Sequence, residues 1–354
     1  MKNIFRKAIT VLSSAALIGA TVGVAAAANY PAPFTSNTAV VVGASAAPSD
    51  NIAAGNIVAD LKANVAGSTT TTVTGESYQL ERSSTKFNLG DYAGNVVSGT
   101  ITDDKLPTLL KDGKFIDDDN DEFDYTQKLE LNNATLRLTM FDDDDYKEDT
   151  PTLGVSFAND VNILNYTLDF TDDPLWSDLA TSTLPFMGKE YYVLSNGTFG
   201  DTLTLLDSAS TTLLAEGEKA TLTVGGKSYE VEINFVTSTP AVKMKINGEL
   251  TNSLEQSQTY KLKDGTYVGI REVLYSSKQG DVSKVEFSLG SGKLTLQNAT
   301  DVKINEDTIS GLSVRFGTDG STKLQTITAI WNAEDEMFLA KDSRVTMPGF
   351  AGVT

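Results

Sequence analysis

The chain has 354 residues, a formal net charge of −19, and neither cysteine nor histidine. A surface this acidic repels nucleic acid and anionic lipid and attracts cations. Because both residue types are absent, the chain has no Ser-His-Asp triad, no Cys-His pair and no zinc site with Cys or His ligands. Only carboxylate, lysine or tyrosine chemistry and metal sites with oxygen ligands remain.

The first 28 residues have the features of a secretory leader. Three cations in MKNIFRK precede an apolar run from Ala8 to about Val24, and the small residues AAAA follow it. We expect cleavage after about Ala28, which makes residues 1–28 a signal peptide. An uncleaved membrane anchor is the alternative, but the run is short and ends in small residues. Removal of the three cations makes the net charge of the mature chain about −22.

A short strand and a helix are predicted near the start of the mature chain. Ala39–Val42 is apolar, and Ser49 or Asp50 can cap a helix that we expect at Ser49–Ala63. The apolar residues at helical spacing are Ile52, Ile57, Val58 and Leu61. The intervening GASAAPSD lacks both the G-x-G-x-x-G pattern and a P-loop lysine. We therefore interpret the segment as a packed βα unit and not as a nucleotide site.

The chain beyond this helix has the pattern of strands and turns. We expect strands at Thr126–Leu131 and Ala134–Phe141, with Asn132-Asn133 as the turn, and further strands across Thr183–Leu206. Gly-Gly and Asn-Gly dipeptides separate later strand-like runs, and Asp264-Gly265 is typical of a hairpin. Strands at a spacing of roughly 8–12 residues predict β-sandwich or barrel modules.

The expected fold class is mainly β with a small α/β N-terminal part, followed by immunoglobulin-like β-sandwich modules. A mature chain of about 326 residues should form two or three domains. We predict an N-terminal α+β domain at 29–185, a β-sandwich-like domain at 186–275 and a C-terminal β-rich domain at 276–354.

Six segments distributed along the chain carry a family resemblance. They are VVVGASAAPSDNIAAGNIVADL, LPTLLKDGKFIDDDNDEFDYTQ, LPFMGKEYYVL, GELTNSLEQSQTYKLKDGTYVGIREVLY, KVEFSLGSGKLTLQNATDVKINE and ITAIWNAEDEMFLAKDSRVTMPGF. In their order and number they resemble the archaeal surface-layer (S-layer) proteins of the methanococcal type. The resemblance runs from about Asn37 to Phe350, which is nearly the whole mature chain.

This resemblance implies a secreted structural subunit that tiles the cell surface as a two-dimensional lattice and acts as cell envelope and permeability barrier. It implies self-association, contacts with other envelope components and no enzymatic activity. We expect no nucleic-acid partner, and no membrane span in the mature chain, because no second apolar run of spanning length occurs. Two alternatives remain: a cell-surface adhesin or glycan-binding module, and a secreted hydrolase that uses two carboxylates.

Two acidic clusters are candidate cation sites. The candidate ligands are Asp117, Asp119, Asp121, Asp143 and Asp145. The first three have the alternate spacing of an EF-hand loop, but Glu122 stands where that loop needs glycine and Lys128 where it needs glutamate. An EF-hand is therefore rejected. A solvated acidic loop and a structural Ca²⁺ held in a looser acidic turn are the two interpretations that these clusters leave open, and we expect no other cofactor.

Four N-x-[ST] sequons are candidate glycosylation sites in an exported chain. Their asparagines are Asn133, Asn165, Asn196 and Asn298. Asn196 and Asn298 lie in turn-like sequences and are expected to be better acceptors than Asn165, which lies inside a predicted strand.

The two tryptophans bear on the adhesin and hydrolase alternatives, because sugar-binding clefts use aromatic platforms. Trp176 and Trp331 are far apart in the sequence and both have apolar neighbours. We therefore expect each of them to pack in a core.

Overall fold

A computed structural model of the chain describes residues 34, 38–43, 46–64, 75–80, 84–96, 99–117, 119–131, 136–142, 151–207, 209–278, 281–341, 343–350 and 353–354. The chain divides into two compact units. The first comprises Met1–Thr74, Met140–Val155 and Phe338–Arg344, and the rest of the chain forms the second. The predicted signal peptide and its cleavage point lie outside the described residues.

The first unit contains α2 (Pro48–Asn64), which confirms the helix predicted at Ser49–Ala63. The helix begins at a proline, whose missing N–H costs nothing in the first turn. Ser49 and Asp50 therefore lie inside the helix, and the prediction that one of them caps it is wrong.

One face of α2 is turned inward. Ile52 and Gly55 are buried and Val58 is half-buried, whereas Ile57 is 46% exposed and does not belong to this face. The strand predicted at Ala39–Val42 does not form, because no described strand pairs with this segment. The expected α/β part is thus reduced to its helix.

A sheet in the order β23-β5-β4 consists of β23 (Met337–Ala340), β5 (Leu153–Phe157) and β4 (Arg137–Met140). Phe141 and Phe338 pack edge to face with ring centroids 5.0 Å apart. A Cβ atom at Gly154 would collide with the carbonyl oxygen of Leu339, so glycine permits this close approach. The strand predicted at Ala134–Phe141 is confirmed in its second half, and the predicted turn at Asn132-Asn133 lies outside the described residues.

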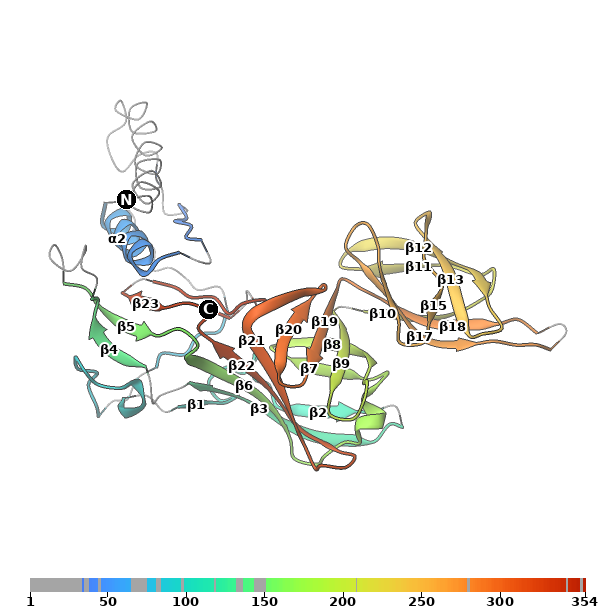
Figure 1. The fold of residues 1–354 in the computed structure, drawn as a ribbon, viewed down its shortest axis with the longest axis horizontal. Coiled ribbons are helices and arrows are strands. Elements are labelled where there is room, and N and C mark those ends of the chain that lie inside the picture. Colours follow the sequence, from blue (N-terminus) through green and yellow to red (C-terminus); the bar gives the residue numbers. More distant parts are fainter. Residues whose placement is uncertain are drawn as a thin grey trace, which may run out of the picture. The chain divides into compact units, whose positions relative to one another are not determined.

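The second unit is built on an antiparallel sheet of 11 strands in the order β1-β3-β6-β22-β21-β20-β19-β9-β8-β7, with β2 beside β3 (Figure 1). The strands are β1 (Thr100–Ile101), β2 (Gly113–Ile116), β3 (Glu122–Leu131), β6 (Asn162–Phe170), β7 (Thr183–Phe186), β8 (Lys189–Ser195), β9 (Thr202–Asp207), β19 (Gly292–Gln297), β20 (Thr300–Ile304), β21 (Asp307–Thr318) and β22 (Leu324–Asn332). Of two 3₁₀ turns in this unit, η1 (Ala93–Asn95) precedes β1, and η2 (Trp176–Leu179) lies between β6 and β7. The strands predicted at Thr126–Leu131 and across Thr183–Leu206 are confirmed.

This sheet curls strongly. Phe186 of β7 packs edge to face on Tyr166 of β6 with centroids 5.2 Å apart, although β22, β21, β20, β19, β9 and β8 separate the two strands in the sheet. Strands β2 and β7, near opposite edges of the sheet, also contact each other. Phe350, from the end of the chain, packs on Phe186 with centroids 5.7 Å apart. The concave side of the curled sheet therefore encloses an aromatic core.

Two smaller antiparallel sheets face each other as a sandwich (Figure 1). One has the order β10-β18-β17-β16 and the other β11-β12-β13-β14, with β15 beside β13. The strands are β10 (Ser210–Ala215), β11 (Lys219–Val224), β12 (Lys227–Val236), β13 (Ala241–Ile246), β14 (Glu249–Leu250), β15 (Leu254–Glu255), β16 (Thr259–Lys261), β17 (Tyr267–Leu274) and β18 (Lys284–Gly290). Buried residues of both sheets, including Phe287 of β18 and Ile233 of β12, form one hydrophobic cluster. The structure is thus mainly β with a sandwich module, as predicted.

The sandwich is an insertion in the curled sheet. It follows β9 and precedes β19, and these strands pair with Asp207 opposite Gly292, so the chain leaves and re-enters the sheet at adjacent points. The domain boundaries do not follow those predicted after residues 185 and 275. Strand β7 crosses the first boundary, and the second lies between the paired strands β17 and β18. Local patterns identify strands, but the partner of each strand is set by long-range packing.

Short turns determine the hairpin registers. Gly225-Gly226 and Asn247-Gly248 form two-residue loops in which all four φ angles are positive, as a type I′ turn requires. The hairpin predicted at Asp264-Gly265 is confirmed between β16 and β17, where Lys261 pairs with Tyr267.

Substitution of Phe186 by alanine should destabilise the curled sheet by about 3–5 kcal/mol, because the ring is fully buried between Tyr166 and Phe350. The matched control Ile116→Ala, in β2 of the same sheet, should cost about 1 kcal/mol or less, because Ile116 is 48% exposed. Denaturant unfolding followed by tryptophan fluorescence measures both. Equal destabilisation by the two substitutions would contradict the enclosed aromatic core.

Candidate functional site

The predicted cation ligands of the first acidic cluster lie in the turn between β2 and β3. Asp117 is 8% exposed, and its Oδ1 accepts the N–H groups of Asp119 at 3.1 Å and Asp121 at 2.8 Å. Asn120 in this turn has a φ of +69°. The Asp117 carboxylate therefore holds the turn together, while Asp119 and Asp121 are exposed.

Asp143 and Asp145, the ligands predicted in the second cluster, lie outside the described residues. Within the described part of the chain, no group of three or more acidic residues is arranged to hold a metal ion. The Ca²⁺ site stays a prediction.

A shallow depression of about 390 Å³ lies at the end of the β2–β3 hairpin away from the acidic turn, where Gly113 pairs with Tyr125 and Thr171 follows β6. Its carboxylates make local contacts: Asp112 accepts the N–H of Gln127 at 3.0 Å, and Asp124 pairs with Lys114 at 3.2 Å. Burial, together with the nearby carboxylates of Glu190 and Asp112, raises the pKa of Tyr125 in its wall. The depression is thus lined by groups that already stabilise the β2–β3 hairpin.

Both tryptophans are core residues, as predicted. Trp176 is 3% exposed and Trp331 is 7% exposed. The ring of Trp176 packs edge to face on Phe316, with centroids 5.2 Å apart, and its indole N–H donates to the carbonyl oxygen of Asn196 at 2.5 Å. Neither residue serves as an exposed platform for a sugar ring.

The sequon asparagines differ in how their side-chain amides are used. Nδ2 of Asn196 donates to the carbonyl oxygens of Trp176 at 2.5 Å and Ser177 at 3.0 Å. Asn165 lies inside β6, between β3 and β22, and its Oδ1 accepts Nδ2 of Asn162 at 2.9 Å. A glycan on Asn196 would replace one of the two donated hydrogens.

Asn298 has the most available amide nitrogen of the described sequons. Its Oδ1 accepts the N–H of Phe316 at 3.1 Å, and no described residue accepts a hydrogen bond from its Nδ2. The following Ala299 and Thr300 are exposed in the turn between β19 and β20. Asn133 lies outside the described residues, so Asn298 is the sequon that this structure favours.

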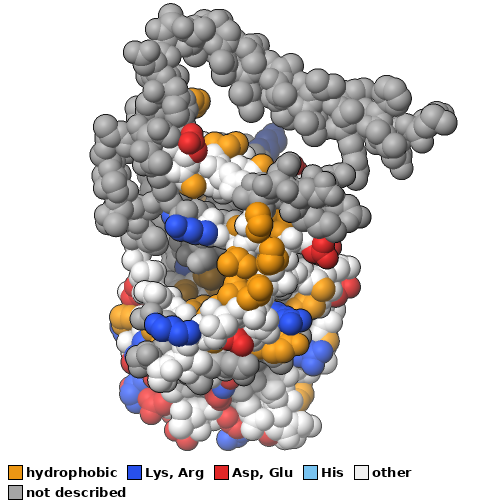
Figure 2. All heavy atoms as spheres, turned by 90° about the vertical axis from the view of Figure 1, so that its left-hand side faces the viewer, with side chains coloured by type: hydrophobic (Ala, Val, Ile, Leu, Met, Phe, Trp, Pro, Cys, Tyr) orange, Lys and Arg blue, Asp and Glu red, His pale blue; other side chains and the backbone are white. Residues whose placement is uncertain are grey.

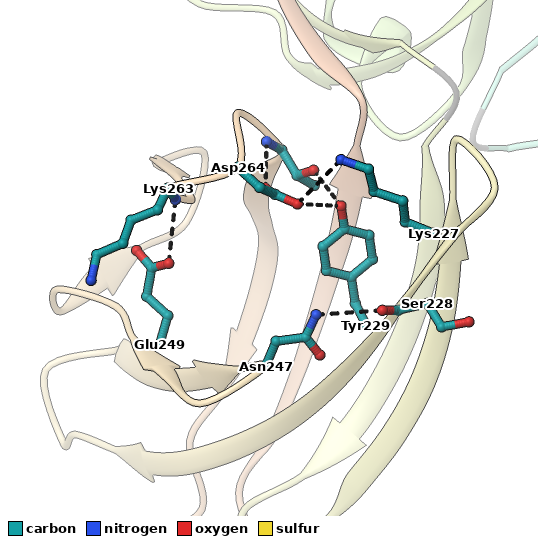
Figure 3. A network of polar contacts seen from close by, with 8 residues as sticks. Lys227, Ser228, Tyr229, Asn247, Glu249, Lys263 and Asp264 are labelled. Carbon is teal, nitrogen blue, oxygen red and sulfur yellow. Dashed lines mark hydrogen bonds and ion pairs between the residues drawn. The ribbon is translucent and has the colours of Figure 1, made fainter.

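A polar network that no sequence motif indicated fastens one end of the sandwich (Figure 3). Figure 3 shows Tyr229 and Lys227 of β12 turned toward Asp264 in the β16–β17 loop. The Tyr229 hydroxyl donates to Oδ2 of Asp264 at 2.7 Å and lies 2.7 Å from Oγ1 of Thr266. Oδ1 of Asp264 accepts the N–H of Thr266 at 3.0 Å. Because the loop belongs to one sheet and β12 to the other, these bonds join the two sheets.

The Glu249 carboxylate makes a second link in the same network. Glu249 of β14 accepts the N–H of Lys263 at 3.2 Å and the hydroxyl of Tyr260 in β16 at 3.1 Å. The hydrogen bond from Tyr229 holds the pKa of Asp264 below its usual range. Burial raises the pKa of Tyr229. The network favours the ionised form of Asp264 and holds the two sheets together at this end of the sandwich.

A buried tyrosine lies where the sandwich contacts the curled sheet. Tyr267 of β17 is 1% exposed and packs with Leu194 and Leu206 of β8 and β9. The ammonium groups of Lys261 and Lys293 lie 5.7 and 5.6 Å from its ring centroid, within the range of a cation–π interaction. Burial raises the pKa of this tyrosine. Its packing against Leu194 and Leu206 anchors the sandwich at its base.

Acidic and basic side chains are interspersed on the face shown in Figure 2, and hydrophobic side chains gather near its centre. Among the residues that the structure describes, no helix has the length and apolarity needed to cross a bilayer.

In comparisons with known proteins, no family model, curated protein or solved structure matches the chain.

Substitution of Tyr229 by phenylalanine should destabilise the sandwich by about 1 kcal/mol at pH 7, because it removes a buried donor to a carboxylate. The pKa of Asp264 is depressed in the folded chain, so its contribution is present above the unfolded pKa of about 4 and is lost as the pH falls further. The loss of unfolding free energy in the variant should therefore be smaller at acid pH.

Amide hydrogen exchange in β12 and β17, compared with the wild type at each pH, measures this loss. Tyr275→Phe, at a 42% exposed ring, is the control; an equal loss in both variants would contradict the network.

The two sequons in turns should differ in glycan occupancy. Asn298 should be more fully occupied than Asn196, because Nδ2 of Asn196 already donates to two carbonyl oxygens and Nδ2 of Asn298 donates to no described acceptor. Glycopeptide mass spectrometry of the protein from its source cells measures both sites. Higher occupancy at Asn196 would show that these hydrogen bonds do not limit the modification.

Proposed function

We propose that the chain is a secreted structural subunit of a two-dimensional paracrystalline cell-surface (S-layer) lattice, which serves as cell envelope and permeability barrier. The observation that carries the proposal is the location of the segments that resemble S-layer proteins. LPFMGKEYYVL spans β7 and β8, GELTNSLEQSQTYKLKDGTYVGIREVLY spans β14 to β17, and KVEFSLGSGKLTLQNATDVKINE spans β18 to β20. These segments therefore build the curled sheet and both sheets of the sandwich.

Residues that build a framework are suited to shape and contact. In the described part of the chain, the carboxylates with the clearest roles hold turns or loops: Asp117 binds the N–H groups of its own turn, and Asp264 joins the two sheets. A subunit that must keep one shape in an array benefits from loops tied in this way. The proposed role in self-assembly thus agrees with the use that the fold makes of its acidic residues.

The net charge bears on how subunits would pack. A mature chain of about −22 must bring like-charged surfaces together, and physiological salt screens that repulsion only beyond roughly 8 Å. Bridging Ca²⁺ or Mg²⁺ would offset the repulsion at closer range. We therefore propose that divalent cations are the cofactor of assembly and that excess acid keeps single subunits apart until cations are present.

The chain beginning at Asn29 should remain monomeric in chelator and form ordered two-dimensional sheets when Ca²⁺ is added, because the cation relieves the repulsion between acidic subunits. Electron microscopy and analytical ultracentrifugation measure the two states. NaCl at matched ionic strength is the control that separates bridging from screening. A closed dimer or tetramer that never extends under any cation or salt condition would contradict the lattice and favour an adhesin.

A further inference from the structure

Edge strands decide which surfaces of a β protein can pair with another chain, because each presents unpaired N–H and C=O groups. Most described edges here are blunted. Strand β7 contains Pro185 and contacts β2, and β11 contains Lys219. Strands β2, β4 and β16 each contain a cation, and β1, β14 and β15 have two residues each. Strand β23 has four residues.

Strand β10 is the exception among the described edges. It has six residues, STTLLA, with no charge and no proline, and its pairing with β18 is regular from Ser210 to Ala215. Leu213, in the middle of the strand, is 47% exposed although it is apolar. A long, regular, uncharged edge strand is the kind that pairs with another strand.

The hydrogen bonds show which residues of β10 face outward. The N–H of Glu216 donates to the oxygen of Ser283, which continues the β10–β18 register, so even-numbered residues pair with β18 and odd-numbered ones face the open edge. The N–H of Ala215 points outward accordingly and donates to Oε2 of Glu218 at 2.9 Å. No described residue bonds to the outward N–H and C=O groups of Thr211 and Leu213.

We propose that β10 pairs antiparallel with β10 of a second copy of the chain, about a two-fold axis at Thr212. Opposite residues of paired strands must point to the same face, so a two-fold axis passes through a residue position, and Thr212 and Leu213 are the two central positions of the strand. An axis at Leu213 would need the N–H of Ala215, which Glu218 already binds. An axis at Thr212 places Thr211 opposite Leu213 of the other copy and uses every outward group of both residues.

The electrostatics of this edge favour a second copy as the occupant. Strand β10 has no charge, although the whole chain has a net charge of −19. Glu286, opposite Leu213 on β18, is neutralised by Arg271 at 2.6 Å. Two acidic chains can therefore approach each other at β10 without repulsion from an unpaired carboxylate on the neighbouring strand β18. The contact rests on the proposed function for its biological setting, and it supplies one of the different self-contacts that a lattice needs.

A single cysteine placed on the axis tests the register, because the chain has no native cysteine. The axial pair of the proposed register is not hydrogen-bonded, and its Cα atoms lie about 4.5 Å apart, within disulfide range. Under mild oxidation with Ca²⁺, Thr212→Cys should give a covalent dimer several-fold faster than Leu213→Cys. Faster cross-linking of Leu213→Cys would overturn the proposed axis, and no dimer from either variant would overturn the pairing.

A charge on the edge tests the contact without a thiol. Leu213→Lys should weaken self-association at least about tenfold. In the proposed pairing, the new ammonium group lies next to Thr211 of the other copy, and a charge on an edge strand opposes pairing. Leu250→Lys replaces a leucine that is 52% exposed in β14, at the opposite end of the other sheet from β11, and should leave self-association unchanged. Sedimentation measures both, and equal behaviour of the two variants would overturn the proposal.

The β10 pairing and the proposed lattice can be contradicted independently of each other. Ordered sheets without the Thr212→Cys dimer, and unaffected by Leu213→Lys, would overturn β10 pairing and leave the lattice standing. Covalent dimers that never extend into sheets would support β10 pairing and overturn the lattice.

Discussion

The contact between Phe186 and Tyr166 is the constraint on which the rest of the second unit depends. It can form only if the 11-stranded sheet curls until β7 approaches β6, with centroids 5.2 Å apart. The curl buries Tyr166 completely, so its hydroxyl needs a partner and donates to Oε1 of Gln127. Burial also raises the pKa of Tyr166 strongly, which keeps the hydroxyl neutral and able to donate. One packing contact thus specifies both an aromatic core and a buried polar contact.

The curl also determines which edges are left open. Strand β7 is brought against β2, and Pro185 removes one of its N–H donors, so neither strand is a simple template for another chain. The chain leaves the curled sheet for the sandwich at the end of β9 and returns to it at the start of β19. Because β9 and β19 are paired, the base of the sandwich is attached to the sheet at two neighbouring points. Tyr267, held against Leu194 and Leu206, fills that base. The edge strand β10, which has neither charge nor proline, belongs to this inserted sandwich and not to the curled sheet.

Acidic residues serve mainly local roles in the described part of the chain. Oδ1 of Asp319 accepts the backbone N–H groups of Ser321, Thr322 and Lys323, and these bonds hold its pKa well below the usual range. Asp117 and Asp264 hold other turns in the same manner. Each such carboxylate stabilises a loop while its charge adds to the net negative charge of the chain. In the lattice that we propose, the same residues would both shape the monomer and oppose its association in the absence of cations.

The sequence by itself determined the helix, the turns and most of the predicted strands, because periodicity, Asn-Gly and Gly-Gly dipeptides and proline act over a few residues, whereas Ala39–Val42 has no partner strand and forms none. The helix at Pro48–Asn64, the strands across Thr183–Leu206 and the burial of both tryptophans follow from such local patterns. Only the tertiary structure decided that β3, β9 and β22 share one sheet, that Tyr229 meets Asp264, and that β10 remains an edge. These are pairings between distant segments, whose free energy depends on burial and register and leaves no trace in local spacing. The sequence shows that STTLLA is uncharged. Whether such a strand is an open edge depends on which strands pair with it, and only the tertiary structure decides that.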